Sequence, residues 1–263
     1  MTEIVLVRHG ETFQNRHQVV QGQDPTYGRL TPEGMTQARA LGQALAPEAF
    51  DTVYCSPLER AVLTLAGILE PRPGDRTLPL VFAPELKEIN LSLYHGKTFE
   101  ERNRDLGQLY RIQRPKGGEN WEDVRQRAGE FVRNVIEPKA QEQGWNKVLV
   151  VAHGGVTRGI LADFLGVSTE EAYDDGIEGP GLTQHNGCIN RVWLNAQGQA
   201  ERLLVNDTRH LQGTATHPGG IHGGYTYQRE ATSGTPQNPT PPDATPAQGS
   251  YLQAPGWVAQ AAS

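Results

Sequence analysis

With 263 residues, the chain is long enough for one substantial α/β domain with a large buried core. A net charge of -6 and a pI near 5.8 give no general attraction to nucleic acid or anionic lipid, so neither is an expected partner. No stretch approaches membrane-spanning length, and no cationic segment leads into a long apolar run, so we expect a cytoplasmic protein that does not insert into a membrane. The two cysteines, Cys55 and Cys188, lie in stretches typical of strands, which indicates buried free thiols rather than a disulfide framework.

The chain opens with a short apolar run that stops at polar residues. Ile4 to Val7 are four consecutive apolar residues, three of them β-branched, as is typical of a strand buried on both faces. The run ends at Arg8, His9 and Gly10. Because ligands bind beyond the carboxyl ends of the strands in open α/β sheets, we expect Arg8 and His9 at the rim of a site. Gly10 would let the chain turn sharply and approach a ligand closely.

Two helices with a polar cap followed by proline are expected next. Thr31 can cap the free N–H groups of a helix that begins at the following proline. After a short strand over 51–55, Ser56 and its following proline repeat this arrangement. Arg60 then falls in the first turn of the second helix, where a phosphate would be bound favourably.

The middle of the chain is less regular. Residues 79–83 predict a weaker strand, because prolines flank it. The polar stretch 85–118 shows no clear periodicity, and loops of this length are often functional lids, so we place it over the rim of the site. The clearest amphipathic helix follows, from Trp121 to Ile136.

A second unit of strand, histidine, glycine and helix follows. The apolar strand 147–152 stops at His153 and Gly154, as the first strand stops at its own histidine and glycine. Residues 188–194 and 200–205 then predict two strands joined by a short turn.

This order of elements predicts a three-layer α/β/α sandwich with a largely parallel central sheet, formed by residues 1–212. From about residue 213 onward, Gly, Pro, Thr, Ala and Gln dominate, and after Glu230 only Asp243 is charged. Such a composition buries too little apolar surface to offset the entropy of ordering. We therefore expect residues 213–263 to be a disordered tail.

The residues after the first strand carry a family resemblance. Arg-His-Gly-Glu-Thr over 8–12, followed by Asn15, resembles the signature of the histidine phosphatase superfamily, the phosphoglycerate-mutase-like proteins. Three further segments, 56–64, 85–89 and 152–158, resemble family segments in the same order, so that the resemblance covers roughly the first 210 residues. They would supply the family's second phosphate-binding arginine, its proton donor and its second histidine, here Arg60, Glu88 and His153. Glu11 and Glu85 are rivals for the proton donor.

Removing a phosphoryl group needs a nucleophile, cations around the transferring oxygens and an acid for the leaving group. We expect His9 to be the nucleophile, because a neutral imidazole needs little activation and a phosphohistidine divides one difficult step into two. A backbone carbonyl, such as that of a nearby glycine, should hold its other ring nitrogen. Arg8 and Arg60 would hold the phosphoryl oxygens as fork donors. Further phosphate ligands are expected from Asn15, Gly154 and His153, and His153 would also donate to the developing charge.

These expectations combine into a metal-independent phosphomonoesterase of the phosphatase branch, a histidine acid phosphatase-type hydrolase that acts on a small phosphorylated metabolite. No metal, dinucleotide or P-loop motif stands out, so no cofactor is expected. A cofactor-dependent phosphoglycerate mutase stays open, although Glu119 follows Glu88 by only 31 residues, which looks like the shorter phosphatase pattern. A noncatalytic, regulatory phosphate-binding module is the third interpretation. A homodimer is compatible with the sequence.

Overall fold

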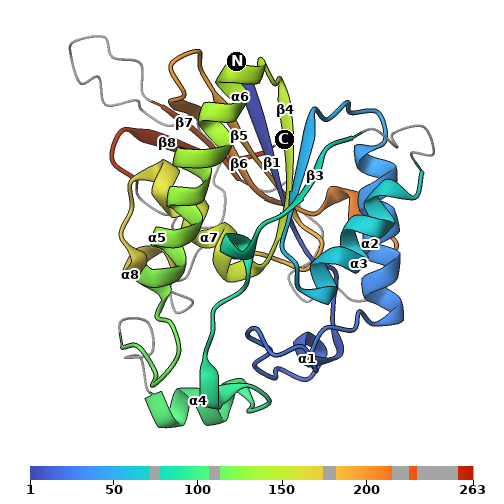
Figure 1. Cartoon of the computed structure of the whole chain (residues 1–263), viewed down its shortest axis with the longest axis vertical. Helices are drawn as coiled ribbons and strands as arrows, with labels where there is room; N and C mark the ends of the chain where they lie inside the picture. The colour runs from blue at the N-terminus through green and yellow to red at the C-terminus, as the bar shows by residue number, and fades with distance from the viewer. Residues whose placement is uncertain (72–77, 107–112, 174–181, 215–224, 230–253, 263) are drawn as a thin grey trace, which may run out of the picture.

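The computed structural model describes residues 1–71, 78–106, 113–173, 182–214, 225–229 and 254–262. Within them, eight strands form one sheet in the order β3-β2-β4-β1-β5-β6-β7-β8 (Figure 1). The strands are β1 (Thr2–Arg8), β2 (Thr52–Cys55), β3 (Leu80–Phe82), β4 (Lys147–Ala152), β5 (Ile189–Leu194), β6 (Ala200–Asp207), β7 (Tyr225–Arg229) and β8 (Trp257–Ala261). The α-helices are α1 (Phe13–Arg16), α2 (Pro32–Leu45), α3 (Glu59–Leu69), α4 (Phe99–Leu106), α5 (Trp121–Phe131), α6 (Glu137–Gln143), α7 (Gly154–Leu165) and α8 (Thr169–Ala172). Short turns of other helix types are η1 (Pro84–Leu86), η2 (Ser92–Tyr94), the π-helical η4 (Val132–Ile136) and η5 (Arg209–Leu211).

The sheet has a parallel half and an antiparallel half. Strands β3, β2, β4 and β1 run parallel, whereas each step from β1 to β5, β6, β7 and β8 is antiparallel. β4 and β1 lie in the middle of the whole sheet, in a register that pairs Glu3 with Lys147 and Arg8 with Ala152. The α/β architecture with parallel strands at its core is therefore confirmed.

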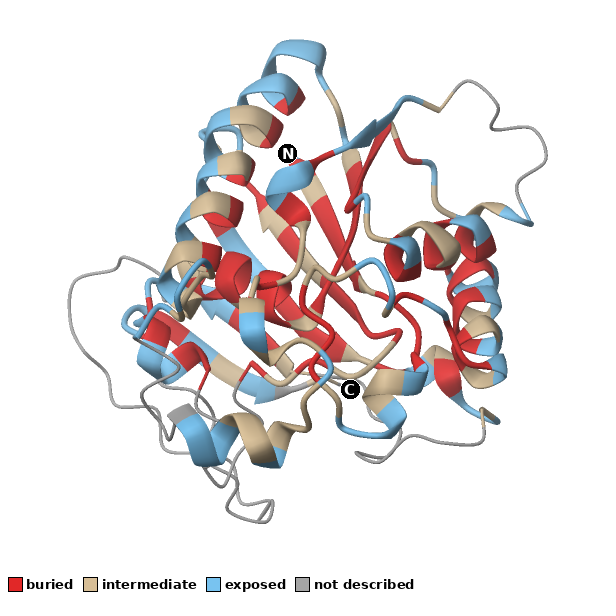
Figure 2. Ribbon diagram, turned by 60° about the horizontal axis from the view of Figure 1, so that its bottom comes forward, coloured by how far each residue is buried: buried red, intermediate tan, exposed pale blue. Residues whose placement is uncertain are grey.

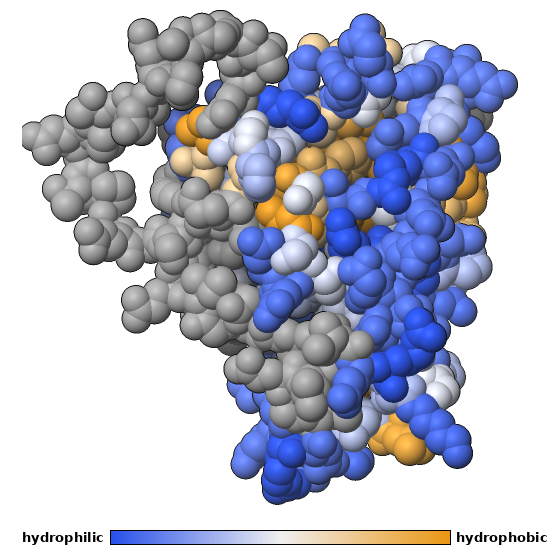
Figure 3. Space-filling view, turned by 90° about the vertical axis from the view of Figure 1, so that its left-hand side faces the viewer, coloured by the Kyte–Doolittle hydropathy of each residue, from blue (hydrophilic) through white to orange (hydrophobic). Residues whose placement is uncertain are grey.

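Helices cover both faces of the sheet and make the outer layers. Val5, Val7 and the matching side chains of β4 pack against α2 and α3, while Ile4 and Leu6 face α5, η4 and α7. Figure 2 shows the strands buried between these two layers. The solvent side of α5 carries Glu122 and other polar residues, and this side of the molecule is largely hydrophilic (Figure 3).

The helix starts follow from local chemistry, with one correction. Thr31 caps α2 as expected, because its Oγ1 accepts a hydrogen bond from the N–H of Gly34 over 2.9 Å. The helix expected directly after Ser56 begins later, at Glu59, with Leu58 as its N-cap and no side-chain cap. The Ser56 hydroxyl is used elsewhere: it accepts from the N–H of Leu58 at 3.3 Å and contacts a histidine of the site described below.

The stretch expected to be an irregular lid contains η1, η2 and a helix, α4. Figure 1 shows α4 on the side of the sheet toward which β1 runs, near α1. The stretch is attached to the loop after α1 by backbone bonds, among them Gly96 N–H to the carbonyl of Val20 at 2.9 Å and Phe99 N–H to that of Gln18 at 2.8 Å. Leu91 and Phe99 line a cavity there.

The prediction of a disordered tail is wrong for two segments, which form β7 and β8. Leu203 of β6 pairs with Tyr227, and Tyr227 pairs with Ala259. Tyr227 is fully buried and Trp257 is 8% exposed against the core. A strand added to an existing sheet takes its backbone partners and part of its apolar cover from its neighbour, so a segment of low hydrophobicity can be ordered without a core of its own. Residues 215–224 and 230–253 of the predicted tail lie outside the described residues.

Candidate active site

The site is built where the two central parallel strands end. Because Arg8 of β1 pairs with Ala152 of β4, the next residues, His9 and His153, lie side by side, and their ring centroids are 5.1 Å apart. His9 is 2% exposed and His153 is fully buried. Gly10 permits this turn, since a Cβ on it would lie 2.4 Å from the carbonyl oxygen of Gly34. Close backbone approach, rather than a positive φ, thus requires glycine here.

The first histidine has a defined proton position. His9 Nδ1 lies 2.7 Å from the carbonyl oxygen of Gly10, which can only accept, so Nδ1 carries the proton and Nε2 keeps its lone pair. The predicted support by a glycine carbonyl is therefore confirmed. Burial, followed by the charges of Arg60 and Arg8, holds the pKa of His9 well below 6.5. The ring is neutral at neutral pH.

Arg60 lies in the first turn of α3 and is 1% exposed. Its Nη2 and Nη1 donate to the carbonyls of Gly22 and Tyr27 at 2.8 and 3.2 Å, and its Nε donates to Nδ1 of His153 at 3.2 Å. Burial lowers the pKa of Arg60 to about 10, so the group keeps its charge at neutral pH. These three contacts, two with the loop between α1 and α2 and one with His153, fix the plane of this guanidinium.

The second histidine lies behind this arginine rather than on the cavity wall. His153 accepts from Arg60 through Nδ1, so its own proton is on Nε2, which lies 2.7 Å from Oγ of Ser56. Burial and the charge of Arg60 hold the pKa of His153 well below 6.5.

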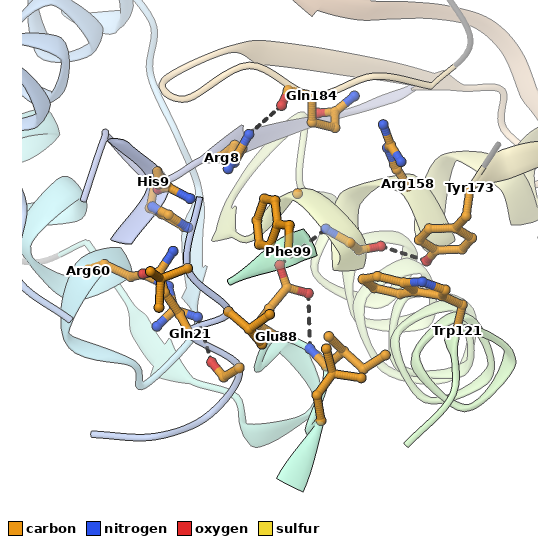
Figure 4. Close-up of a pocket in the computed structure, with 18 of the residues that line it drawn as sticks. Arg8, His9, Gln21, Arg60, Glu88, Phe99, Trp121, Arg158, Tyr173 and Gln184 are labelled. Atoms are coloured by element: carbon orange, nitrogen blue, oxygen red, sulfur yellow. Dashed lines mark hydrogen bonds between the residues drawn. The ribbon is translucent and has the colours of Figure 1, made fainter. Parts of the chain in front are cut away.

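Arg8 lies on the side of His9 opposite to Arg60 (Figure 4). Its Nη1 donates to the backbone carbonyl of Gln184, and its Nε is buried without a hydrogen-bond partner among the described residues. A Cβ on Gly154 would lie 3.3 Å from that Nε, so a larger residue would crowd the guanidinium. An unsatisfied buried donor of a charged group favours an anionic ligand at this point.

Asn15 lines the same cavity, and its Oδ1 accepts from Oγ1 of Thr12 at 2.9 Å and from Nδ2 of Asn186 at 3.1 Å. Asn186 also donates to the carbonyl of His9 at 3.1 Å. No motif or periodicity marks Asn186, because it lies in a loop before β5 that only the folded chain brings to the end of β1.

Glu88 lies across the cavity from the basic groups (Figure 4). Its Oε2 accepts from the N–H of Gly155 at 3.2 Å, and its Oε1 accepts from the N–H of Ile89 at 3.0 Å. The two rival carboxylates are elsewhere: Glu11 pairs with Arg16 at 2.6 Å, and neither it nor Glu85 lines the cavity.

The cavity has a volume of about 260 Å³. Of the residues predicted for the site, those that line it are Arg8, His9, Asn15, Arg60, Glu88 and Gly154. Residues that received no role from the sequence also line it, among them Phe99, Arg102, Trp121, Arg158, Tyr173 and Gln184. Phe99 and Arg102 belong to the stretch 85–118 that we expected over the rim of the site. Arg158 also had a signal, since it stands four residues after Gly154, one helical turn further along the same helix face.

The described residues meet the requirements neither of a grouped metal site nor of a membrane-spanning helix. Within the described part of the chain, no three His, Cys, Asp or Glu side chains are grouped as metal ligands would be. No helix among the described residues combines the length and apolar character that crossing a bilayer requires.

Comparison with known proteins identifies the family. The family model for the histidine phosphatase superfamily (branch 1) matches residues 4–207. The adenosylcobalamin/alpha-ribazole phosphatase of Escherichia coli (strain K12) is 30% identical over 210 residues, which cover 76% of this chain and 93% of that protein. A 2,3-bisphosphoglycerate-dependent phosphoglycerate mutase of Cytophaga hutchinsonii is 33% identical over 178 residues, covering 65% of this chain and 81% of the mutase.

A similar solved structure is that of Bacillus stearothermophilus YhfR, with a TM-score of 0.65 and 26% identity over 82% of this chain and 99% of that one. The region matched by the family model, residues 4–207, contains every residue predicted for the site. It ends at the last residue of β6, so β7 and β8 lie outside it. The chain belongs to the histidine phosphatase superfamily, branch 1.

Proposed function

We propose that this protein is a metal-independent phosphomonoesterase that hydrolyses a small phosphorylated metabolite through a phosphohistidine on His9. The observation that carries the proposal is the bond between His9 Nδ1 and the carbonyl of Gly10, because it leaves the Nε2 lone pair of a neutral ring at the cavity. Arg8 and Arg60, the guanidinium groups beside that ring, supply the positive charge that a phosphoryl group requires.

In the proposed first step, His9 Nε2 attacks phosphorus and forms a P–N bond while the P–O bond to the alcohol breaks. Protonated Glu88 gives its proton to the departing alcohol oxygen. Arg8 and Arg60 hold the phosphoryl oxygens, and Asn15 and the backbone of Gly154 border them.

In the second step, water attacks the phosphohistidine, and the Glu88 carboxylate accepts the proton of that water. Inorganic phosphate leaves, and both His9 and Glu88 return to their starting states. His153 keeps Arg60 in place through the 3.2 Å contact. Because its Nε2 proton lies beside Ser56 and its ring is not on the cavity wall, we assign it the support of Arg60 rather than direct donation to the phosphoryl group.

A mutase is the second candidate, because a phosphoglycerate mutase is among the similar proteins. The same phosphohistidine would then pass its phosphoryl group to a second phosphoglycerate hydroxyl instead of to water. The two functions differ in one product: only the phosphatase releases inorganic phosphate in proportion to the ester consumed.

The test measures phosphate release from a panel of phosphomonoesters in the presence of EDTA, with 3-phosphoglycerate assayed in parallel for isomerisation with a bisphosphate primer. We expect release by the native chain, its loss in His9→Ala, and an acid-labile phosphoryl label on the native chain only. His17→Ala, which changes an exposed histidine, is the matched control. Isomerisation without phosphate release would establish the mutase, and release that survives His9→Ala would refute the proposal.

A further inference from the structure

A buried tyrosine stands behind the proposed proton donor. Tyr173, at the end of α8, is 1% exposed, and its hydroxyl donates to the carbonyl of Gly155 over 2.6 Å. Burial raises the pKa of Tyr173 above its ordinary value, so the phenol remains protonated and acts as a donor. The accepting residue is the second glycine of the pair that follows His153.

Gly155 connects this tyrosine to Glu88. Its carbonyl accepts from Tyr173, and its N–H donates to Oε2 of Glu88 at 3.2 Å. Gly155 is the second residue of α7, so its N–H is one of the helix N–H groups that have no partner within the helix. Gly155 therefore links the two side chains: its N–H holds Glu88, and its carbonyl is held by Tyr173.

Trp121 closes the arrangement from the other side. Its ring stacks on that of Tyr173 with centroids 4.3 Å apart and an interplanar angle of 16° (Figure 4). A Cβ on Gly155 would lie 2.2 Å from Cζ3 of Trp121 and 2.6 Å from Oε1 of Glu88. A side chain at position 155 would therefore collide with both the indole and the carboxylate, so glycine is needed where the N–H must reach Glu88.

We propose that Tyr173 is a positioning residue for protonation of the leaving group, acting through Gly155 on Glu88. The inference rests on the proposed function, because it concerns the step in which Glu88 protonates the alcohol as the P–O bond breaks. Tyr173 transfers no proton itself. Its hydroxyl holds Gly155, whose N–H orients the carboxyl group of Glu88.

Leaving-group dependence separates this role from a merely structural one. An alkyl alcohol leaves only with a proton, whereas p-nitrophenolate leaves without one, so only the alkyl ester needs a well-placed acid. kcat/KM is the suitable quantity, because it includes alcohol departure and excludes the later hydrolysis of phosphohistidine.

Tyr173→Phe keeps the ring stacked on Trp121 and removes only the hydroxyl. We expect kcat/KM for an alkyl phosphate to fall about tenfold, with that for p-nitrophenyl phosphate unchanged. Glu88→Gln should show the same selectivity with a larger loss for the alkyl ester, about 10²-fold or more. Tyr54→Phe is the matched control, since Tyr54 is another 1% exposed tyrosine, in β2 and away from the cavity, and it should leave both values unchanged.

Equal losses of kcat/KM for both esters in Tyr173→Phe, or no loss for either, would overturn the inference. The proposed function would still stand in that case, because the native chain hydrolyses the esters. A native chain that hydrolyses neither ester would overturn the proposed function and this inference together. The thermal midpoint of each variant is measured alongside, and a selective loss in a variant with an unchanged midpoint supports the positioning role.

Discussion

Arg60 donates from Nε to Nδ1 of His153 over 3.2 Å, and this contact sets the proton position of the buried histidine. A neutral imidazole carries one proton, which is therefore on Nε2, beside Ser56. The same guanidinium is fixed by two backbone carbonyls. One arginine thus both supplies charge to the cavity and determines the hydrogen-bonding state of its neighbour.

Replacing this arginine by lysine should be severe although the charge is kept. In Arg60→Lys, a compact ammonium cannot reproduce the planar fork that contacts Gly22, Tyr27 and His153 at once. We expect kcat/KM for the preferred phosphomonoester to fall about 10²-fold, the typical cost of one lost transition-state donor. Arg39→Lys, at an exposed position on α2, should retain native kcat/KM. Native kcat/KM in Arg60→Lys would contradict this assignment.

Stability should decrease on mild acidification because of the two buried histidines. Burial holds the folded-state pKa values of His9 and His153 below 6.5, so below pH 6.5 the unfolded chain binds protons that the folded chain does not. Each histidine should then lower the free energy of unfolding by up to about 1.4 kcal/mol per pH unit until its folded pKa is reached. Urea unfolding at several pH values measures this slope. His153→Asn should reduce it by one histidine's share, and an unaltered slope would count against the depressed pKa.

Four charged side chains form a ring of ion pairs near the starts of β1 and β4, at the ends of these strands away from the site. We expect this ring to contribute to stability without affecting activity. Lys147 Nζ lies 2.9 Å from Glu3 and 2.7 Å from Glu48, and Arg191 contacts the same two carboxylates. These side chains are only 12–23% exposed, so Glu48→Gln leaves two mostly buried cations with one carboxylate partner fewer. We expect a loss of about 2 kcal/mol in urea unfolding, with unchanged kcat.

The exposed pair of Arg39 and Glu70, whose side chains are 56% and 64% exposed, provides the comparison for the charge ring. Glu70→Gln should change the free energy of unfolding by less than about 0.5 kcal/mol. Equal effects of Glu48→Gln and Glu70→Gln would show that the ring adds nothing beyond an ordinary surface pair.

The added strands should be part of the folded unit. Trp257 of β8 is 8% exposed and packs on the core, whereas its neighbour Val258 is 49% exposed. We expect Trp257→Ala to lower the free energy of unfolding by about 3 kcal/mol and Val258→Ala to lower it by less than about 0.5 kcal/mol, both measured by urea unfolding. Similar small effects in both variants would indicate that β8 is attached only weakly to the sheet.

The central strands could be predicted because their burial on both faces produces continuous apolar runs. The observed bounds of β4 equal the predicted 147–152, and the abrupt end of β1 marked Arg8 and His9 as rim residues. The family motifs supplied Arg60 and Glu88 in the same way, since each stands beside residues of recognisable pattern. Local sequence was sufficient for these residues.

What escaped prediction depends on contacts between distant segments. Ser56 has the chemistry of a helix cap, but its hydroxyl is engaged by His153, 97 residues later, and α3 begins at Glu59. Tyr173 reaches the site because α8 packs on α7 and α5, and Asn186 reaches it because the loop before β5 lies against His9 at the end of β1. β7 and β8 were missed for a similar reason, since their order comes from the sheet to which they are added.

The pairing of β1 with β4 also has a kinetic meaning. Glu3 pairs with Lys147 and Thr2 pairs with Leu194, so both neighbours of the first strand come from the second half of the chain. Contacts of such long sequence separation are entropically costly to form and are associated with slow folding. Because His9 and His153 are adjacent only through this pairing, phosphatase activity should return during refolding together with the last cooperative phase rather than with early helix formation.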